Sequence, residues 1–105
     1  MASIKTELNR ALKKVSSKKS YKDLGLYIKS ADGERMPVED DFGNEFTVVA
    51  VFLQIGVENP PSGKLKGGWF KSFIKEASDF DFRLDSVYVD RDGDLICSFI
   101  GNYSE

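Results

Sequence analysis

The segment that most restricts the possible folds is the run FTVVAVFLQIGV, residues 46–57. Successive side chains of a β-strand point to opposite faces of the sheet, so a strand with one wet face alternates apolar and polar residues. This run is apolar at nearly every position of both alternating sets. It therefore predicts a central strand that is covered on both faces and forms the middle of the core.

Two other segments show the three- and four-residue spacing of an amphipathic helix. In residues 3–18 the apolar positions are Ile4, Leu8, Ala11, Leu12 and Val15. In residues 69–77 they are Trp69, Phe70, Phe73, Ile74 and Ala77, with lysine, serine and glutamate at the positions between. Each segment predicts a helix whose apolar side packs on the sheet.

Asp-Gly pairs indicate the hairpins, because aspartate and glycine tolerate the positive φ angles of tight turns. Asp32-Gly33 predicts a turn between a strand near residues 24–29 and a less regular strand in ERMPVED, where Pro37 requires an edge or a bulge. DDFGNE, residues 40–45, predicts another turn before the central strand. Asp92-Gly93 predicts a turn between strands near 82–89 and 95–100. The alternation changes frame at Asp85-Ser86, which indicates a bulge.

These elements define an α+β single domain over residues 1–105. We expect an antiparallel sheet of four to five strands with two packed helices, in the order α-β-β-β-α-β-β. A chain of 105 residues is long enough for one core and too short for two.

Several features indicate a cytoplasmic protein that does not enter a membrane. Cys97 is the only cysteine, so no intrachain disulfide can form. The longest apolar run is far shorter than the roughly 20 residues that cross a bilayer. Charges interrupt the apolar positions near the N-terminus, unlike the continuous apolar region of a secretory signal.

The residue content argues against catalysis and against bound cofactors. The chain has no histidine, so a serine or cysteine nucleophile would lack its usual base. DRDGDL, residues 90–95, resembles the start of a calcium loop but has Leu95 where that loop needs glycine and Gly101 where it needs glutamate. PPSGKLKGGWF does not match a phosphate-binding loop. We expect no enzyme activity, no cofactor and no metal site.

The formal net charge of −2 is unevenly distributed along the chain. Residues 1–29 carry eight bases and two acids, whereas residues 30–62 carry one base and seven acids. The simplest interpretation is that these segments face each other in the fold. The alternative is nucleic-acid binding through lysines at the ends of the helices. The candidate residues are Lys13, Lys14, Lys18, Lys19, Lys64 and Lys66.

In the order of its expected elements alone, residues 3–78 resemble the double-stranded-RNA-binding domain, with no matching motif. That resemblance implies lysines near the start of the second helix as contacts to nucleic acid. The acidic middle segment and the net negative charge weaken the attraction to phosphates on which such binding depends.

The leading hypothesis is therefore protein binding, by an inhibitor, an immunity-type protein or another regulatory protein that occupies a surface of a larger macromolecule. Its partner is unknown, and the acids could meet a basic surface such as the nucleic-acid groove of an enzyme. Homodimerisation, through an unpaired edge strand or through the narrow apolar stripe of the first helix, is a further possibility. The candidate binding residues are the acids Glu39, Asp40, Asp41 and Glu45 and the aromatic residues Trp69, Tyr88 and Tyr103. The alternative for Trp69 is packing in the core.

Overall fold

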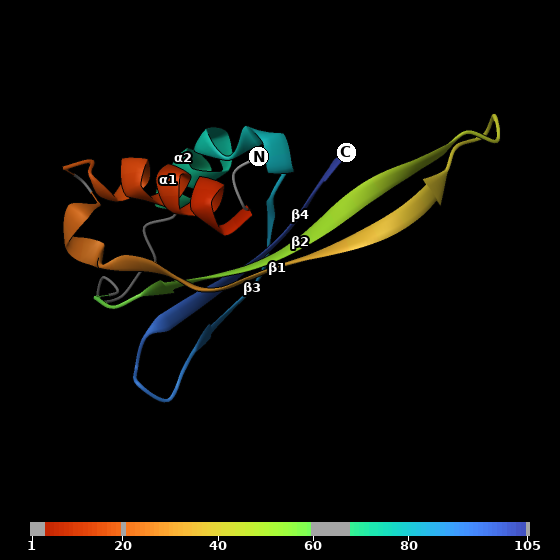
Figure 1. Ribbon diagram of the computed structural model, residues 1–105. Helices are drawn as coiled ribbons and strands as arrows, with labels where there is room; N and C mark the ends of the chain where they lie inside the picture. Colours follow the sequence, from red (N-terminus) through yellow and green to blue (C-terminus); the bar gives the residue numbers. More distant parts are fainter. Residues whose placement is uncertain (1–3, 20, 60–67, 105) are drawn as a thin grey trace.

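The computed structural model describes residues 4–19, 21–59 and 68–104. It is an α+β domain with a single four-stranded antiparallel sheet and two helices, as the sequence predicts (Figure 1). The elements are α1 (Ile4–Ser16), β1 (Leu26–Glu39), β2 (Glu45–Val57), α2 (Gly68–Glu76), β3 (Arg83–Val89) and β4 (Leu95–Ser104). Two short 3₁₀ helices, η1 (Lys22–Leu24) and η2 (Ser78–Phe80), connect helices to strands.

The strand order β1-β2-β4-β3 puts the apolar run into β2, in the interior of the sheet. Both helices lie on one face of the sheet (Figure 1). Alternate residues of β2, among them Val51, Leu53 and Ile55, are fully buried there against Leu8 and Val15 of α1 and Phe73 of α2. The prediction that β2 is covered on both faces is wrong, because no described helix covers the other face. We call that other face the open face.

The Asp32-Gly33 pair is not a turn, which corrects the sequence-based assignment. β1 runs through it without a break, pairing Asp32 with Phe52 and Gly33 with Val51. The structure gives another reason for the glycine: a Cβ atom at Gly33 would lie 2.8 Å from Ile4 Cδ1 and 3.3 Å from Val49 Cγ1. Two expected strands are therefore one long strand, with Pro37 on an edge as expected, and the order is α-β-β-α-β-β. The resemblance in element order to the double-stranded-RNA-binding domain is lost with the missing strand.

The two hairpin turns share one design. In each turn an aspartate, Asp40 or Asp90, accepts hydrogen bonds through its Oδ1 from the backbone N–H groups two and four residues later, at 2.9 to 3.0 Å. The glycine three residues after it, Gly43 or Gly93, has a φ of 82° or 86°. The predictions of a turn at Asp92-Gly93 and of another in DDFGNE are both confirmed.

Register shifts mark two irregular positions. One lies between Leu84 and Ser86 and confirms the expected bulge at Asp85. The other lies between Ile28 and Ser30 and places Lys29 outside the regular pairing. Both positions are on edge strands, where an unpaired residue is tolerated best.

The molecule is elongated, with extents of 51 × 25 × 20 Å, because the β1–β2 hairpin extends past the rest of the sheet. β4 pairs with β2 from Val48 onward, so Glu45 to Thr47 pair with β1 alone. Among the described residues, no helix is long and apolar enough to cross a membrane.

Candidate functional site

The projecting end of the β1–β2 hairpin contains all four acidic residues that the sequence indicated for partner binding. We call residues 36–48 the arm. Glu39, Asp40, Asp41 and Glu45 are four acids within it, and it has no lysine or arginine. The tip points away from both helices, at the far right of Figure 1. The fold thus concentrates negative charge on a narrow extension with solvent around it.

Asp40 differs from the other acids of the arm because it shapes the turn. Its carboxylate accepts hydrogen bonds from the backbone N–H groups of Asn44 and Phe42, both at 2.9 Å, and from Asn44 Nδ2 at 3.2 Å. The bond from the Asn44 backbone is the main cause that lowers the pKa of Asp40, since these donors stabilise the ionised form. Asp40 therefore stays charged while it holds the tip in shape.

Exposed apolar side chains accompany these acids. Phe42, in the turn, is 90% exposed. Met36 and Val38 of β1 and Phe46 of β2 are also exposed, and the pairing of Met36 with Val48 and Val38 with Phe46 puts them on the open face. A cluster of exposed apolar groups among charges is typical of a protein-binding surface. None of these apolar residues is among the binding residues predicted from the sequence, although a phenylalanine inside the charged segment DDFGNE was the signal.

The three aromatic candidates are placed differently. Trp69 is fully buried, with its ring 4.2 Å from that of Phe70 and 6.2 Å from that of Phe99, so it packs in the core. Tyr103 is half-buried, and its ring meets Phe80 edge-on at 5.3 Å. Tyr88 is 42% exposed and lies on β3. None of the three is on the arm.

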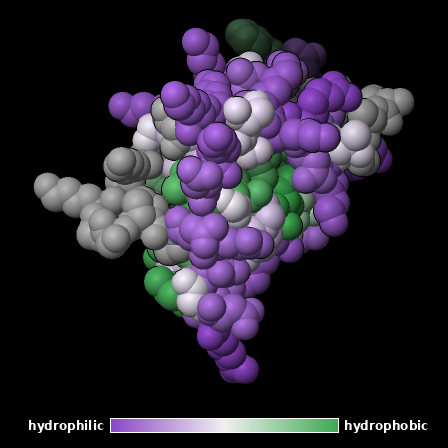
Figure 2. Space-filling model, turned by 90° about the vertical axis from the view of Figure 1, so that its left-hand side faces the viewer, coloured by the Kyte–Doolittle hydropathy of each residue, from purple (hydrophilic) through white to green (hydrophobic). Residues whose placement is uncertain are grey.

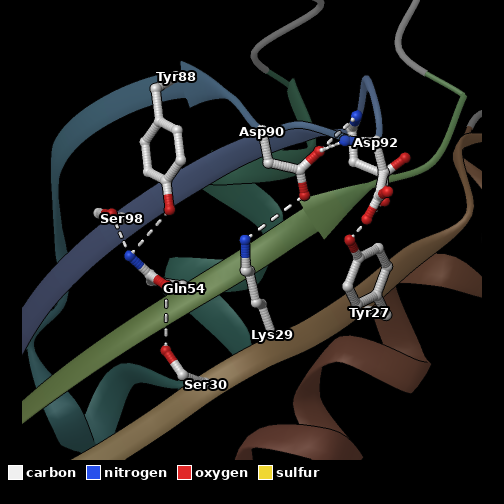
Figure 3. A network of polar contacts seen from close by, with 9 residues as sticks. Tyr27, Lys29, Ser30, Gln54, Tyr88, Asp90, Asp92 and Ser98 are labelled. Carbon is white, nitrogen blue, oxygen red and sulfur yellow. Dashed lines mark hydrogen bonds and ion pairs between the residues drawn. The ribbon is translucent and has the colours of Figure 1, made fainter.

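A polar network joins Tyr88 to the centre of the open face (Figure 3). Gln54 of β2 donates hydrogen bonds to the Tyr88 hydroxyl at 3.3 Å and to Ser98 Oγ at 3.4 Å, and its Oε1 accepts one from Ser30 at 3.2 Å. Lys29 lies 3.4 Å from the Asp90 carboxylate and 5.9 Å from the centre of the Tyr88 ring. These bonds connect all four strands and orient Gln54.

Ionisation in this network follows from its hydrogen bonds. Tyr27 donates a hydrogen bond to Asp94 at 2.6 Å, and this bond to a carboxylate raises the pKa of Tyr27 to about 12. Partial desolvation on its own would raise the pKa of Asp90. The backbone donors Asp94 and Asp92, together with Lys29, outweigh it, so that the pKa of Asp90 is lowered. The segment DRDGDL therefore functions as a turn that is tied to β1.

The lysines of the alternative hypothesis lie at the other end of the molecule. Lys13 and Lys14 are in the last turn of α1, and Lys18 and Lys19 follow it, all exposed. Lys14 makes a long ion pair with Glu76 at 3.9 Å. Lys64 and Lys66 lie outside the described residues. Viewed from this end, the described surface is mostly hydrophilic with a small apolar area in its centre (Figure 2).

The acids of the arm do not face the lysines at the end of α1, so the simplest interpretation of the charge distribution does not hold for these groups. The end of α1 and η1 occupy the left of Figure 1, while the tip of the arm is at the far right. The long β1–β2 hairpin separates them. Negative and positive charge therefore gather at opposite ends of an elongated molecule.

Neither a metal nor a redox centre is indicated by the described part of the chain. It contains no group of three or more cysteine, aspartate or glutamate side chains that could hold a metal ion. Cys97 is buried in β4, and desolvation raises the pKa of its thiol to about 11. The thiolate, which is the reactive form, is therefore disfavoured at neutral pH.

Comparisons of the chain with protein-family models, with curated proteins and with solved structures give no match.

Proposed function

We propose that the protein is a protein-binding module, acting as an inhibitor, an immunity-type protein or another regulatory protein, and that its arm occupies a basic surface of a larger macromolecule. One observation carries this proposal: the fold projects four acids and the exposed side chains of Phe42, Phe46, Met36 and Val38 on one narrow hairpin. The proposed protein has no chemistry of its own and acts in the cytoplasm, where its single cysteine would remain reduced.

The two kinds of side chain on the arm have complementary roles in such binding. Exposed charges contribute little affinity individually, but together they accelerate the encounter with an oppositely charged surface. Apolar and aromatic groups then provide affinity when water is excluded from them. A groove that normally receives nucleic acid fits this description, because it is basic and long enough to admit a hairpin.

The second candidate function is nucleic-acid binding at the opposite end of the molecule. The separation of charge favours it, because the acids of the arm are too far from Lys13, Lys14, Lys18 and Lys19 to neutralise them. Nearby acids oppose it, because they reduce the positive charge of this end. Glu76 pairs with Lys14, and Glu7 and Asp79 lie close to the same lysine.

One capture experiment separates the two functions. The immobilised protein is exposed to nuclease-treated lysate beside two variants. The arm variant carries Glu39→Gln, Asp41→Asn, Phe42→Ala and Glu45→Gln and keeps Asp40 for the turn. The matched control carries Lys13→Gln, Lys14→Gln, Lys18→Gln and Lys19→Gln.

We expect a stoichiometric protein partner that the wild type and the lysine variant retain and the arm variant loses. Loss of that partner from the lysine variant alone would contradict the proposal. Nucleic acid that copurifies without nuclease, and is lost from the lysine variant, would establish the second candidate.

A further inference from the structure

The open face has an apolar centre that the fold leaves uncovered. Val48, Ala50 and Phe52 of β2 belong to this face, because they alternate along the strand with Val49, Val51 and Leu53 of the helix-covered face. Ala50 is buried, so the uncovered centre is at Phe52. Phe52 is 44% exposed although it lies on an interior strand of the sheet. An exposed phenylalanine at the middle of a sheet is unusual, because the helices that could bury it are both on the other face.

A shallow pocket of about 290 Å³ surrounds Phe52. Phe52 and Ile100 give it apolar lining, and Ser30, Gln54 and Ser98 border it. Asp32 from β1 and Asp85 from the bulge of β3 also line it. The two carboxyl-bearing residues therefore border the same pocket as Phe52 from the two opposite edge strands.

The polar border of the pocket is already satisfied within the protein. Gln54 bonds to Ser30, Ser98 and Tyr88, so this amide is held in place and needs no ligand to complete it. Lys29 is engaged by Asp90 at 3.4 Å. What the pocket presents to an incoming group is thus an apolar surface together with negative charge.

The charges on this face select one kind of occupant. It carries Asp32, Glu34 and Asp85 against Arg83, which pairs with Ile100 in the sheet. A second copy stacked face to face would add an equal excess of negative charge, and phosphates would be repelled in the same way. A basic segment of a partner protein is complementary to both the acids and the apolar centre.

We propose that the open face docks a basic segment of the partner protein and that one arginine or lysine of this segment enters the pocket at Phe52. Its aliphatic stem packs on Phe52 and Ile100, and its cationic head lies between Asp32 and Asp85. Met36, Val38 and Phe46 of the arm are on the same face, so this surface continues the one proposed above. The inference rests on the proposed function for the partner but uses a different part of the molecule.

A defined probe tests the pocket without knowledge of the partner. Backbone amide NMR shifts of the full chain are followed during titration with N-acetyl-arginine amide at low ionic strength. The same titration with N-acetyl-citrulline amide is the control, because citrulline has a nearly identical shape without the charge. We expect saturable shifts centred on Asp32, Phe52, Asp85 and Ile100, with binding at least about fivefold tighter for arginine.

Variants assign the response to the pocket. Asp32→Asn with Asp85→Asn, and separately Phe52→Leu, should each weaken arginine binding about fivefold or more while the rest of the amide spectrum stays unchanged. The arm variant described above should bind the probe as the wild type does. Equal binding of arginine and citrulline, shifts centred on the arm, or an unaffected Asp32→Asn, Asp85→Asn protein would each overturn the inference.

The outcomes for the two proposals are separable. If the arm variant loses the captured partner while the pocket still prefers arginine, both proposals hold. If the pocket shows no preference but the arm variant still loses the partner, only the pocket proposal fails. If the pocket prefers arginine but the arm variant keeps the partner, only the proposed function of the arm fails.

Discussion

The hydrogen bond from Tyr27 to Asp94 joins the edge strand β1 to the turn between β3 and β4, 67 residues away in the chain. The ring of Tyr27 lies over Gly56, where any Cβ atom would overlap it. Gly56 on the interior strand β2 thus leaves room for the Tyr27 side chain, which crosses β2 to reach Asp94. The role of Tyr27 could not be predicted from the sequence, since alternation along a strand indicates which face a side chain is on and not its long-range partner.

We predict that Tyr27→Phe lowers the free energy of unfolding by about 1 kcal/mol at neutral pH, because a partly exposed bond to a carboxylate is lost. The folded state raises the pKa of Tyr27 from 10.0 to about 12. The bond therefore stabilises the protein fully below pH 10, and this stabilisation disappears as the pH rises through about 12. Urea unfolding at several pH values measures this change.

The control for this prediction is Tyr103→Phe, because Tyr103 contributes a ring contact with Phe80. It should change the stability by less than about 0.5 kcal/mol. A tyrosinate absorbance component with its midpoint near pH 12 should be present in the wild type and in this control but absent from Tyr27→Phe. If that component persists in Tyr27→Phe, the assignment to Tyr27 is wrong.

Identical Asp-Gly pairs have different roles in this chain, as Gly33 and Gly93 show. Gly93 has a positive φ in a turn with open space around it, whereas Gly33 is in a strand and leaves room for Ile4 of α1. Local sequence cannot separate these cases, because the dipeptide has turn chemistry in both. The long-range packing of α1 decides the outcome at Gly33.

Substitutions at Gly33 distinguish a strand from a turn. We predict that Gly33→Ala costs at most about 1 kcal/mol, since the Ile4 methyl group can move, and that Gly33→Asn costs about 1 kcal/mol more than alanine. A turn with positive φ would reverse this order, because asparagine tolerates that conformation better than alanine. Thermal or urea unfolding of both variants gives the order directly, and a more stable asparagine variant would contradict the strand.

At the scale of elements, the arm is separate from the core. Residues 38–46 include no buried side chain, and the described core lies where α1 and α2 cover the sheet. Natural proteins usually shorten or cover such edges, so a long exposed hairpin requires another explanation than stability. Binding supplies one.

We predict that the arm can be removed without loss of the fold. Replacing residues 37–47 by Asn-Gly keeps the Met36–Val48 pair, which can close a two-residue hairpin through its backbone hydrogen bonds. The free energy of unfolding should change by less than about 1 kcal/mol, as for surface substitutions. Leu53→Ala in the core is the comparison and should cost about 2 to 5 kcal/mol. A loss above about 2 kcal/mol on truncation would show that the arm supports the core.

The elements that the sequence predicted correctly are those determined by local periodicity. Helical spacing placed α1 and α2, and the frame change at Asp85 located the β3 bulge. The run 46–57 correctly indicated an interior strand, yet its apolar residues on both faces did not mean two covered faces. Apolar content shows which residues would gain from burial, and Phe52 remains exposed because neither of the described helices lies on its face of the sheet. The proposed docking surface lies where that expectation failed.

At the scale of the whole molecule, the sequence shows how much charge each segment carries but not where the segments lie. The charge is positive in residues 1–29 and negative in residues 30–62. Because β1 and β2 are long, the acids at the tip of their hairpin lie far from the lysines at the end of α1. The position of the acids depends on Asp32-Gly33. A turn there would have folded the acids of the arm back toward the helices, whereas β1 continues through this pair. The continuous strand makes the molecule elongated, with the acids of the arm at one end and the lysines of α1 at the other.

The arm should be visible in the solution dimensions of the protein. The radius of gyration of the Cα atoms is 15.1 Å, whereas a compact domain of this length has about 13 Å. We predict that small-angle X-ray scattering of the monomer gives a radius above the compact value and that the arm-truncated protein falls toward about 13 Å. The change should be larger than the loss of mass requires, because the removed residues lie farthest from the centre. A wild-type radius near the compact value would mean that the arm folds back in solution, and the acids would then lie too close to the basic end to act as a separate binding surface.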